Sequence, residues 1–311
     1  MKRIKLNQTK DKTFEEGLQE YIENCKARNL REKTIIHYYE SFKCIFKVIP
    51  SDMKISTISQ HTFDNFVIEY KKRFNVKDIT LYTYSRDLKV LLYFFMKNGW
   101  MKEFKISLIK ANKEPVETYN DKELEALLKK PNLKKCSFAE YRDWVIVNLL
   151  LSTGLRVNSF VNLKVSDIDF DNSLLSVRVT KNRKVLIVPL NNTIIKILKE
   201  YILLSGRKDN DLLFCTVYGK ILNRKTIYHS LAEYSHNRGV MKTGIHRFRH
   251  TFAKKWISAG GNVVTLSKIL GHSNLAITEN YINMLNSDLV KDVNTFNILD
   301  EFKKQHIKIN K

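Results

Sequence analysis

The chain has 311 residues, a length that suits about two domains, and it carries 54 Lys and Arg against 32 Asp and Glu. Its net charge of +22 is most simply explained by a polyanionic partner, with nucleic acid as the first candidate and a lysine-rich, solvated surface as the alternative. Both halves are basic, because residues 1–115 hold 23 basic and 14 acidic residues and the remainder holds 31 and 18.

Cysteine spacing and apolar runs exclude several classes of protein. The four cysteines lie far apart and form no CxxC pair, so neither a zinc knuckle nor a disulfide framework is expected. The first residues, MKRIKLNQTKDK, lack the apolar segment of a signal peptide, and the longest apolar run, Val90 to Met96, is too short to span a bilayer. We therefore expect a cytoplasmic protein with reduced thiols and no membrane element.

The N-terminal half predicts a compact, all-α domain. Apolar residues recur at helical spacing in four segments, at 14–27, 32–48, 61–74 and 78–98. The following segment, Lys110 to Asn120, is charged and contains Pro115, and a helix pattern begins at Asp121. We place a helical domain at residues 1–112, a linker at 113–120 and a second domain at 121–311.

The second domain is predicted to be mixed α/β and mainly helical. Residues 138–151 form a strongly apolar helix pattern that Gly154 ends before a second helix carrying Arg156. Alternating, β-branched segments at 165–170, 174–180 and 184–190 predict a small three-stranded sheet. Further helix patterns follow at 194–204 and 225–238, and a C-terminal amphipathic helix is expected at 287–307.

The stretch from Lys242 to Tyr281 carries the chemistry, in what we expect to be three helices joined by glycine turns. His246, Arg249 and His250 are spaced i, i+3 and i+4 and so share one helical face. A second stripe at spacing four, Phe248, Phe252 and Trp256, gives the same helix an apolar side. Gly271 suits the left-handed end of the next helix, and His272 follows it nine residues before Tyr281. Cationic groups converging on one tyrosine suggest phosphate chemistry.

Several motifs carry a family resemblance. HRFRHTFA resembles the HxLRHTFA box of tyrosine recombinases, the phage integrase family, and LGHSNLAITENY is similar to that family's LGHSxxxTTxxY segment. TGLRVNSF is similar to the TGLRxxEL box, and TKNRKVLIVPL matches the hairpin pattern GKGxKxRxVPL. The motifs occur in the family's order over residues 116–285. The resemblance implies a SAM-like helical core-binding domain at the N-terminus, followed by a catalytic domain.

The resemblance also assigns roles to residues. Arg156 and Arg249 would hold the non-bridging oxygens of the scissile DNA phosphate, since an arginine fork pairs two N–H donors with phosphate oxygens. Tyr281 would attack the phosphorus and form a 3′-phosphotyrosyl link, and Lys181 would protonate the departing 5′ oxygen.

The histidines would support this reaction. His246 and His272 would donate hydrogen bonds to the phosphate or accept the tyrosine proton, and His250 would orient its neighbours. A zinc site is disfavoured because no carboxylate or cysteine lies at ligand spacing and HRFRH lacks the acidic base of HExxH. We expect neither a metal nor another cofactor.

One position departs from the pattern. The acidic residue that usually follows the first arginine by three positions is Ser159 here, with Asp167 or Asp169 as candidate substitutes. This departure concerns the efficiency of the reaction more than its type.

The expected function is site-specific recombination through a Holliday junction, as an integrase or transposase of a mobile element or as a Xer-type resolvase. Its partners would be a specific double-stranded DNA site in the nucleoid and three further copies of the chain, bound through the C-terminal tail. Accessory DNA-bending proteins could assist. A type IB topoisomerase-like nicking and closing enzyme, and a DNA-binding regulator with weakened catalysis, are the alternatives.

Overall fold

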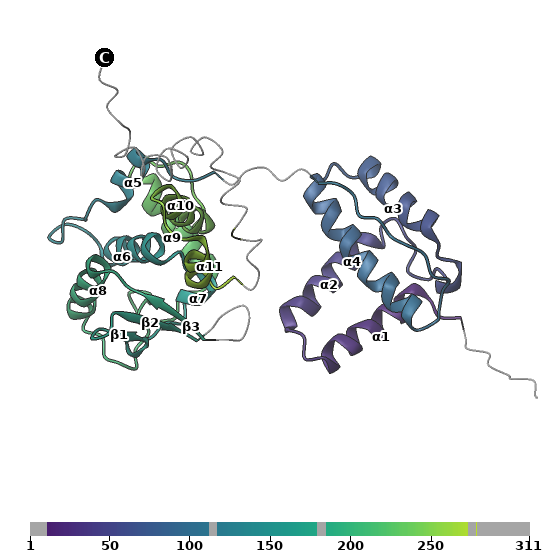
Figure 1. The fold of residues 1–311 in the computed structure, drawn as a ribbon, viewed down its shortest axis with the longest axis horizontal. Coiled ribbons are helices and arrows are strands. Elements are labelled where there is room, and N and C mark those ends of the chain that lie inside the picture. Colours follow the sequence, from purple (N-terminus) through teal and green to yellow (C-terminus); the bar gives the residue numbers. More distant parts are fainter. Residues whose placement is uncertain (1–10, 112–116, 179–184, 273–277, 279–311) are drawn as a thin grey trace, which may run out of the picture. The chain divides into compact units, whose positions relative to one another are not determined.

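A computed structural model describes residues 11–111, 117–178, 185–272 and 278 (Figure 1). The chain divides into two compact units, Met1–Glu114 and Pro115–Lys311, and each is described by itself. None of the helices that the structure describes is long and apolar enough to cross a membrane.

The N-terminal unit contains the four expected helices: α1 (Phe14–Ala27), α2 (Glu32–Ile45), α3 (Gln60–Arg73) and α4 (Asp78–Lys97), with a 3₁₀ turn, η1, at Ile55–Thr57. A capping box formed by Thr13 and Glu16 fixes the start of α1. The long helix α4 packs against the other three. Phe14 is fully buried and its ring meets Phe42 and Phe95 edge to face, so aromatic side chains fill the core, as the sequence predicts.

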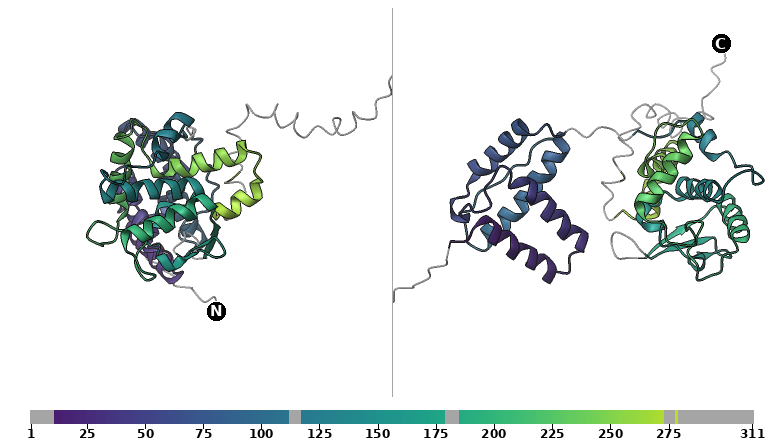
Figure 2. Two further views of the ribbon diagram at one scale, coloured as in Figure 1. Left: turned by 90° about the vertical axis from the view of Figure 1, so that its left-hand side faces the viewer. Right: turned by 180° about the vertical axis from the view of Figure 1, so that it is seen from behind.

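The second unit is built around α6 (Phe138–Thr153). Every residue from Tyr141 to Val147 is buried, because other helices cover α6 on several sides. The surrounding helices are α5 (Asp121–Leu128), α8 (Asn192–Ser205), α9 (Arg224–His236) and α10 (Ile245–Ser258). A glycine-containing turn at 259–262 connects α10 to α11 (Val263–Leu270), and these two helices pack against each other (Figure 2).

A three-stranded antiparallel sheet lies beside these helices in the order β1 (Ile168–Asp169), β2 (Leu174–Val177), β3 (Leu186–Pro189). Leu175 pairs with Val188, and both side chains are fully buried. The helical unit and the sheet confirm the predicted fold class. The predicted strand at 165–170 is wrong in its first half, because residues 165–167 form a 3₁₀ turn, η2 (Val165–Asp167). The Asp167 carboxylate accepts the Lys164 N–H at 2.9 Å and closes this turn.

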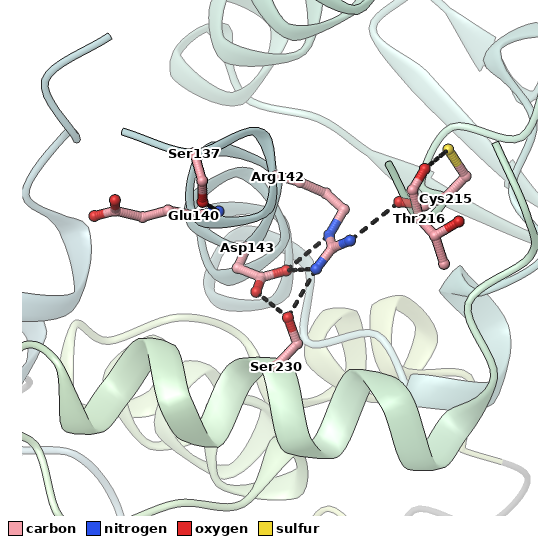
Figure 3. Close-up of polar contacts among 7 residues, drawn as sticks. All are labelled: Ser137, Glu140, Arg142, Asp143, Cys215, Thr216 and Ser230. Carbon is pink, nitrogen blue, oxygen red and sulfur yellow. Dashed lines mark hydrogen bonds and ion pairs between the residues drawn. The ribbon is translucent and has the colours of Figure 1, made fainter. Parts of the chain in front are cut away.

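A buried polar network ties α6 to α9 and to the 213–216 segment (Figure 3). Arg142 and Asp143 are neighbours on α6, and the Arg142 Nε donates to Asp143 Oδ1 at 2.8 Å. The same guanidinium donates to the Cys215 carbonyl at 3.1 Å and to Ser230 Oγ at 2.7 Å, and the Ser230 hydroxyl donates to Asp143. Burial raises the pKa of the Asp143 carboxyl, while Arg142 and Ser230 oppose that shift.

Replacement of Arg142 by Met would leave the Asp143 carboxylate buried without its cation. We expect Arg142→Met to lower the free energy of unfolding of the second unit by about 3–5 kcal/mol, measured by denaturant titration. Lys130→Met is the control, since Lys130 pairs with Glu200 at the surface and its loss should cost about 1 kcal/mol or less. Equal losses in the two variants would contradict a special cost for the buried pair.

Candidate active site

The end of α6 forms one wall of the candidate site. Gly154 ends the helix with a φ of +63°, and an added Cβ there would lie 2.6 Å from side-chain atoms of both Leu270 and Phe252. Both the backbone conformation and the close approach of α11 therefore require glycine. Arg156 follows as the N-cap of α7 (Val157–Phe160). The sequence pattern predicts Arg156 inside a helix; the helix is only four residues long and begins after it.

Two arginines that are distant in the sequence meet at the end of α11. Arg249, on α10, is only 5% exposed and donates to the Gly154 carbonyl at 2.8 Å and to the Leu270 carbonyl at 2.9 Å. Arg156 donates to the same Leu270 carbonyl at 3.3 Å. The last carbonyls of a helix carry partial negative charge, which favours two cations at this position. The guanidinium groups are thus held side by side by backbone atoms.

His272 joins this pair. Its Nε2 lies 2.6 Å from Arg249 Nη2, and its Nδ1 lies 2.7 Å from Thr278 Oγ1. A guanidinium can only donate, so His272 Nε2 accepts and the ring is neutral, with its proton on Nδ1 and directed at Thr278. Thr278 is fully buried and precedes Tyr281 by three residues in the sequence.

Burial and nearby positive charges lower the pKa of the three histidines of this region. Burial, then the neighbouring Arg249, lowers the pKa of His272 to about 4, and burial, then His246 and Arg249, does the same for His250. The pKa of His246 is also lowered, by partial burial and then by the guanidinium groups of Arg224, Arg249 and Arg156. An anion bound here would oppose these shifts.

The structure therefore brings together four of the six predicted site residues: Arg156, His246, Arg249 and His272. Lys181 and Tyr281 lie outside the described residues, as do the C-terminal helix predicted at 287–307 and most of the third predicted helix of the 242–281 stretch.

Ser159 is buried and lines a cavity of about 320 Å³ with Asp167 and Arg178 among its neighbours. The two candidate substitutes for the missing acid are engaged elsewhere. Asp167 accepts from Arg178 Nε at 2.9 Å, and Asp169 accepts backbone N–H groups of its own turn.

Sequence reasoning missed several partners in the site. The carbonyls of Gly154 and Leu270 have no side-chain signal. Arg224, at the start of α9, stands near His246, and no motif points to it. Thr278 could have been found, because it occupies the second threonine position of the LGHSxxxTTxxY pattern. Within the described ranges, no group of three His, Cys, Asp or Glu side chains could hold a metal ion.

Comparison with known proteins gives consistent matches. The Phage integrase family matches residues 117–287. A tyrosine recombinase of Pseudothermotoga lettingae is 25% identical over 279 residues, which cover 86% of this chain and 93% of that protein. Tyrosine recombinase XerA of Saccharolobus solfataricus is 36% identical over 148 residues, 48% of each protein. The solved structure of the Tn1549 transposon integrase with transposon right-end DNA has a TM-score of 0.73 at 19% identity and covers 85% of this chain and 94% of that chain, which is a likeness of fold.

The glycine that ends α6 can be tested by substitution. Gly154→Ala should lower the melting temperature more than Gly206→Ala, measured by thermal unfolding. Gly206 also has a positive φ, +64°, but an added Cβ there meets nothing within 4 Å. Strain alone costs about 1 kcal/mol, and the clash adds about 1–3 kcal/mol at Gly154 only. Equal decreases in melting temperature in the two variants would show that the Leu270 side chain does not restrict the residue at position 154.

The lowered histidine pKa values predict that acid destabilises the second unit. The unfolded chain binds protons at His250 and His272 near pH 6.5, whereas the folded chain binds them only near pH 4. Stability should therefore fall as the pH drops from 7 to 5, because the unfolded state takes up more protons in this window. His250→Gln should flatten the curve of melting temperature against pH. A slope that is unchanged in His250→Gln would contradict the assignment.

Proposed function

The chain belongs to the phage integrase family and is a tyrosine recombinase, an enzyme of DNA recombination, and we propose that Arg156, Arg249, His246 and His272 form its site for the scissile DNA phosphate. The observation that carries this proposal is the convergence of Arg156 and Arg249 on the single carbonyl of Leu270. Guanidinium groups already fixed by backbone atoms need little rearrangement as negative charge develops on the phosphate, which is the most effective form of electrostatic catalysis.

His272 suits the role of proton acceptor. Its Nδ1–H is held by Thr278, and its Nε2 accepts from Arg249; a phosphate that draws the Arg249 donor to its own oxygens would release Nε2 to take up a proton. Bound phosphate would raise the pKa of His272 from about 4, because an anion favours the protonated ring. His246, which is more exposed, would donate a hydrogen bond to a non-bridging oxygen.

The covalent step uses two residues beyond the described part of the chain. The Tyr281 oxygen attacks the phosphorus, its proton passes to His272, and the bond to the 5′ oxygen breaks as Lys181 supplies a proton to that oxygen. The product is a 3′-phosphotyrosyl link and a free 5′-hydroxyl. The phosphodiester energy is kept in the new bond, so rejoining to another 5′-hydroxyl requires no ATP.

The proposed partner is a specific double-stranded DNA site. The Tn1549 integrase structure contains transposon right-end DNA, and the charge of +22 on this chain fits the same class of ligand. We propose strand exchange between two such sites in a tetramer, with residues 287–307 contacting the neighbouring copy. The biological role would be that of an integrase or transposase of a mobile element, or of a Xer-type resolvase.

Covalent capture tests this function and identifies the DNA site in the same experiment. The substrate is a pool of DNA duplexes of random sequence, each with a nick near its centre that traps the cleaved end. Protein–DNA product that resists SDS is isolated, its DNA is amplified, and the selection is repeated over several rounds. We expect the parent to enrich a sequence with inverted repeats, and Tyr281→Phe to form no covalent product while its DNA affinity stays within about 2-fold. Tyr218→Phe is the control, because Tyr218 is 88% exposed and belongs to none of the motifs that carry the site residues.

On the enriched site, Arg156→Gln should reduce the cleavage rate by about 10²–10³-fold, the usual cost of a lost transition-state donor. The slope of the logarithm of its DNA-binding constant against the logarithm of salt concentration should change by only about one unit, the contribution of one phosphate contact. Cleavage that survives in Tyr281→Phe, or a loss of binding that equals the loss of cleavage in Arg156→Gln, would overturn the proposal. Recombinant junctions in an assay with two sites, in place of relaxed circles, support recombination over a topoisomerase activity.

A further inference from the structure

Helix α10 has a third stripe, which the proposed chemistry does not use. Arg247, Thr251 and Lys255 are spaced by four residues, and residues 117–121 lie along them. Arg247 Nη1 donates to Glu117 Oε2 at 2.9 Å, the Tyr119 N–H donates to Thr251 Oγ1 at 3.0 Å, and Lys255 pairs with the Asp121 carboxylate.

These contacts recur at nearly equal distances along the segment and along the helix. Contacts fall on every second residue of the segment 117–121 and on every fourth residue of α10. Two residues of extended chain advance about 6.5 Å, and four residues of helix advance about 6 Å. Alternate side chains and N–H groups of the segment can therefore meet successive turns of the helix. We call residues 117–121 the strap.

The centre of the strap is part of the hydrophobic core. Tyr119 is 3% exposed, its ring centroid lies 4.9 Å from that of Phe248, and Thr251 is 1% exposed. Its ends are ion pairs at the surface, where Glu117 is also 3.8 Å from Lys242. A buried hydrogen bond between a backbone N–H and a hydroxyl therefore sits between two exposed charge pairs.

The strap contacts the side of α10 that faces away from the site. On a helical wheel, the strap stripe is about 150° from the stripe of His246, Arg249 and His250, and the core stripe of Phe248 lies about 110° from the site stripe. Core and strap together would thus fix the rotation of α10 about its own axis.

We propose that the strap positions the active-site face of α10, with Thr251 and the Glu117–Arg247 pair as positioning residues for Arg249 and the histidines. This inference rests on the proposed function for its catalytic consequence, although the positioning itself does not require DNA. Without the Thr251 hydroxyl, the buried Tyr119 N–H has no acceptor. The strap then detaches from α10, because the exposed N–H can hydrogen-bond to water. The helix can then turn away from the carbonyls of Gly154 and Leu270.

Thr251→Val and Thr251→Ser in the full chain form the first test. Valine keeps the shape and removes the hydroxyl, whereas serine keeps the hydroxyl. We expect the cleavage rate constant at saturating DNA to fall about 10-fold in Thr251→Val and to stay within about 2-fold of the parent in Thr251→Ser, well below the melting temperature of either. A role in stability alone would lower the melting temperature of Thr251→Val and leave its rate at saturating DNA unchanged, and that result would overturn the proposal.

A readout without DNA separates this inference from the proposed function. The pKa of His250, about 4 in the parent, is followed by NMR titration of its ring protons. We expect it to move toward 6.5 in Thr251→Val, because rotation of α10 exposes the site face, and to stay low in Thr251→Ser. An unshifted His250 in a folded Thr251→Val protein would overturn the positioning role even if the parent cleaves DNA. A parent that forms no covalent product would overturn the proposed function instead.

Charge reversal is a second test should Thr251→Val fail to fold. Glu117→Lys and Arg247→Glu should each slow cleavage at saturating DNA by about 3–5-fold, and the double variant should recover to within about 2-fold of the parent. Lys130→Glu with Glu200→Lys, an exposed pair in the same unit, is the matched control and should show no such pattern. A double variant no faster than the slower single variant would contradict the proposal.

Discussion

The carbonyl of Leu270 is the point on which the candidate site depends. It accepts from Arg156 and Arg249, so it brings together cations that would otherwise repel each other in a strongly basic protein. The approach of α11 to the end of α6 makes this contact possible, and that approach requires a glycine at 154. The left-handed Gly271 then turns the chain so that His272 meets Arg249. Each part of the site is therefore set by backbone geometry as much as by side chains.

Helix α10 has three stripes of side chains, and each contacts a different part of the second unit. One stripe of α10 forms the site, a second packs into the core, and a third holds the segment 117–121. Because α10 packs against α6, whose buried Arg142–Asp143 pair is bonded to α9, the platform behind the site is crosslinked by polar contacts within an apolar core. Such a platform suits chemistry in which a phosphate must be held by donors already in place.

Periodicity alone located nearly all the helices and the three-stranded sheet, because amphipathic patterns report which faces are buried. Periodicity failed where a single contact decides the local structure, whether that contact is with a near neighbour or with a residue far along the chain. The turn at 165–167 depends on one aspartate that competes with strand pairing, and Arg156 precedes its short helix. Residues 117–120 had the charge and flanking proline of a linker, yet Tyr119 packs against Phe248. The motifs pointed to Arg156 and Arg249, but not to the carbonyl oxygens that accept from them, since backbone acceptors are the same in every sequence.

The two arginines and their common acceptor also bear on the order of folding. Arg156 and Leu270 are 114 residues apart in the chain, and Arg249 and Gly154 are 95 apart. Each of these contacts closes a loop of about a hundred residues, which costs more chain entropy than a local contact does. A nascent or partly unfolded chain would carry the positive charge that attracts nucleic acid, but it would lack the paired guanidinium groups. A chain that ends before Leu270 therefore lacks the common acceptor that holds the two guanidinium groups together.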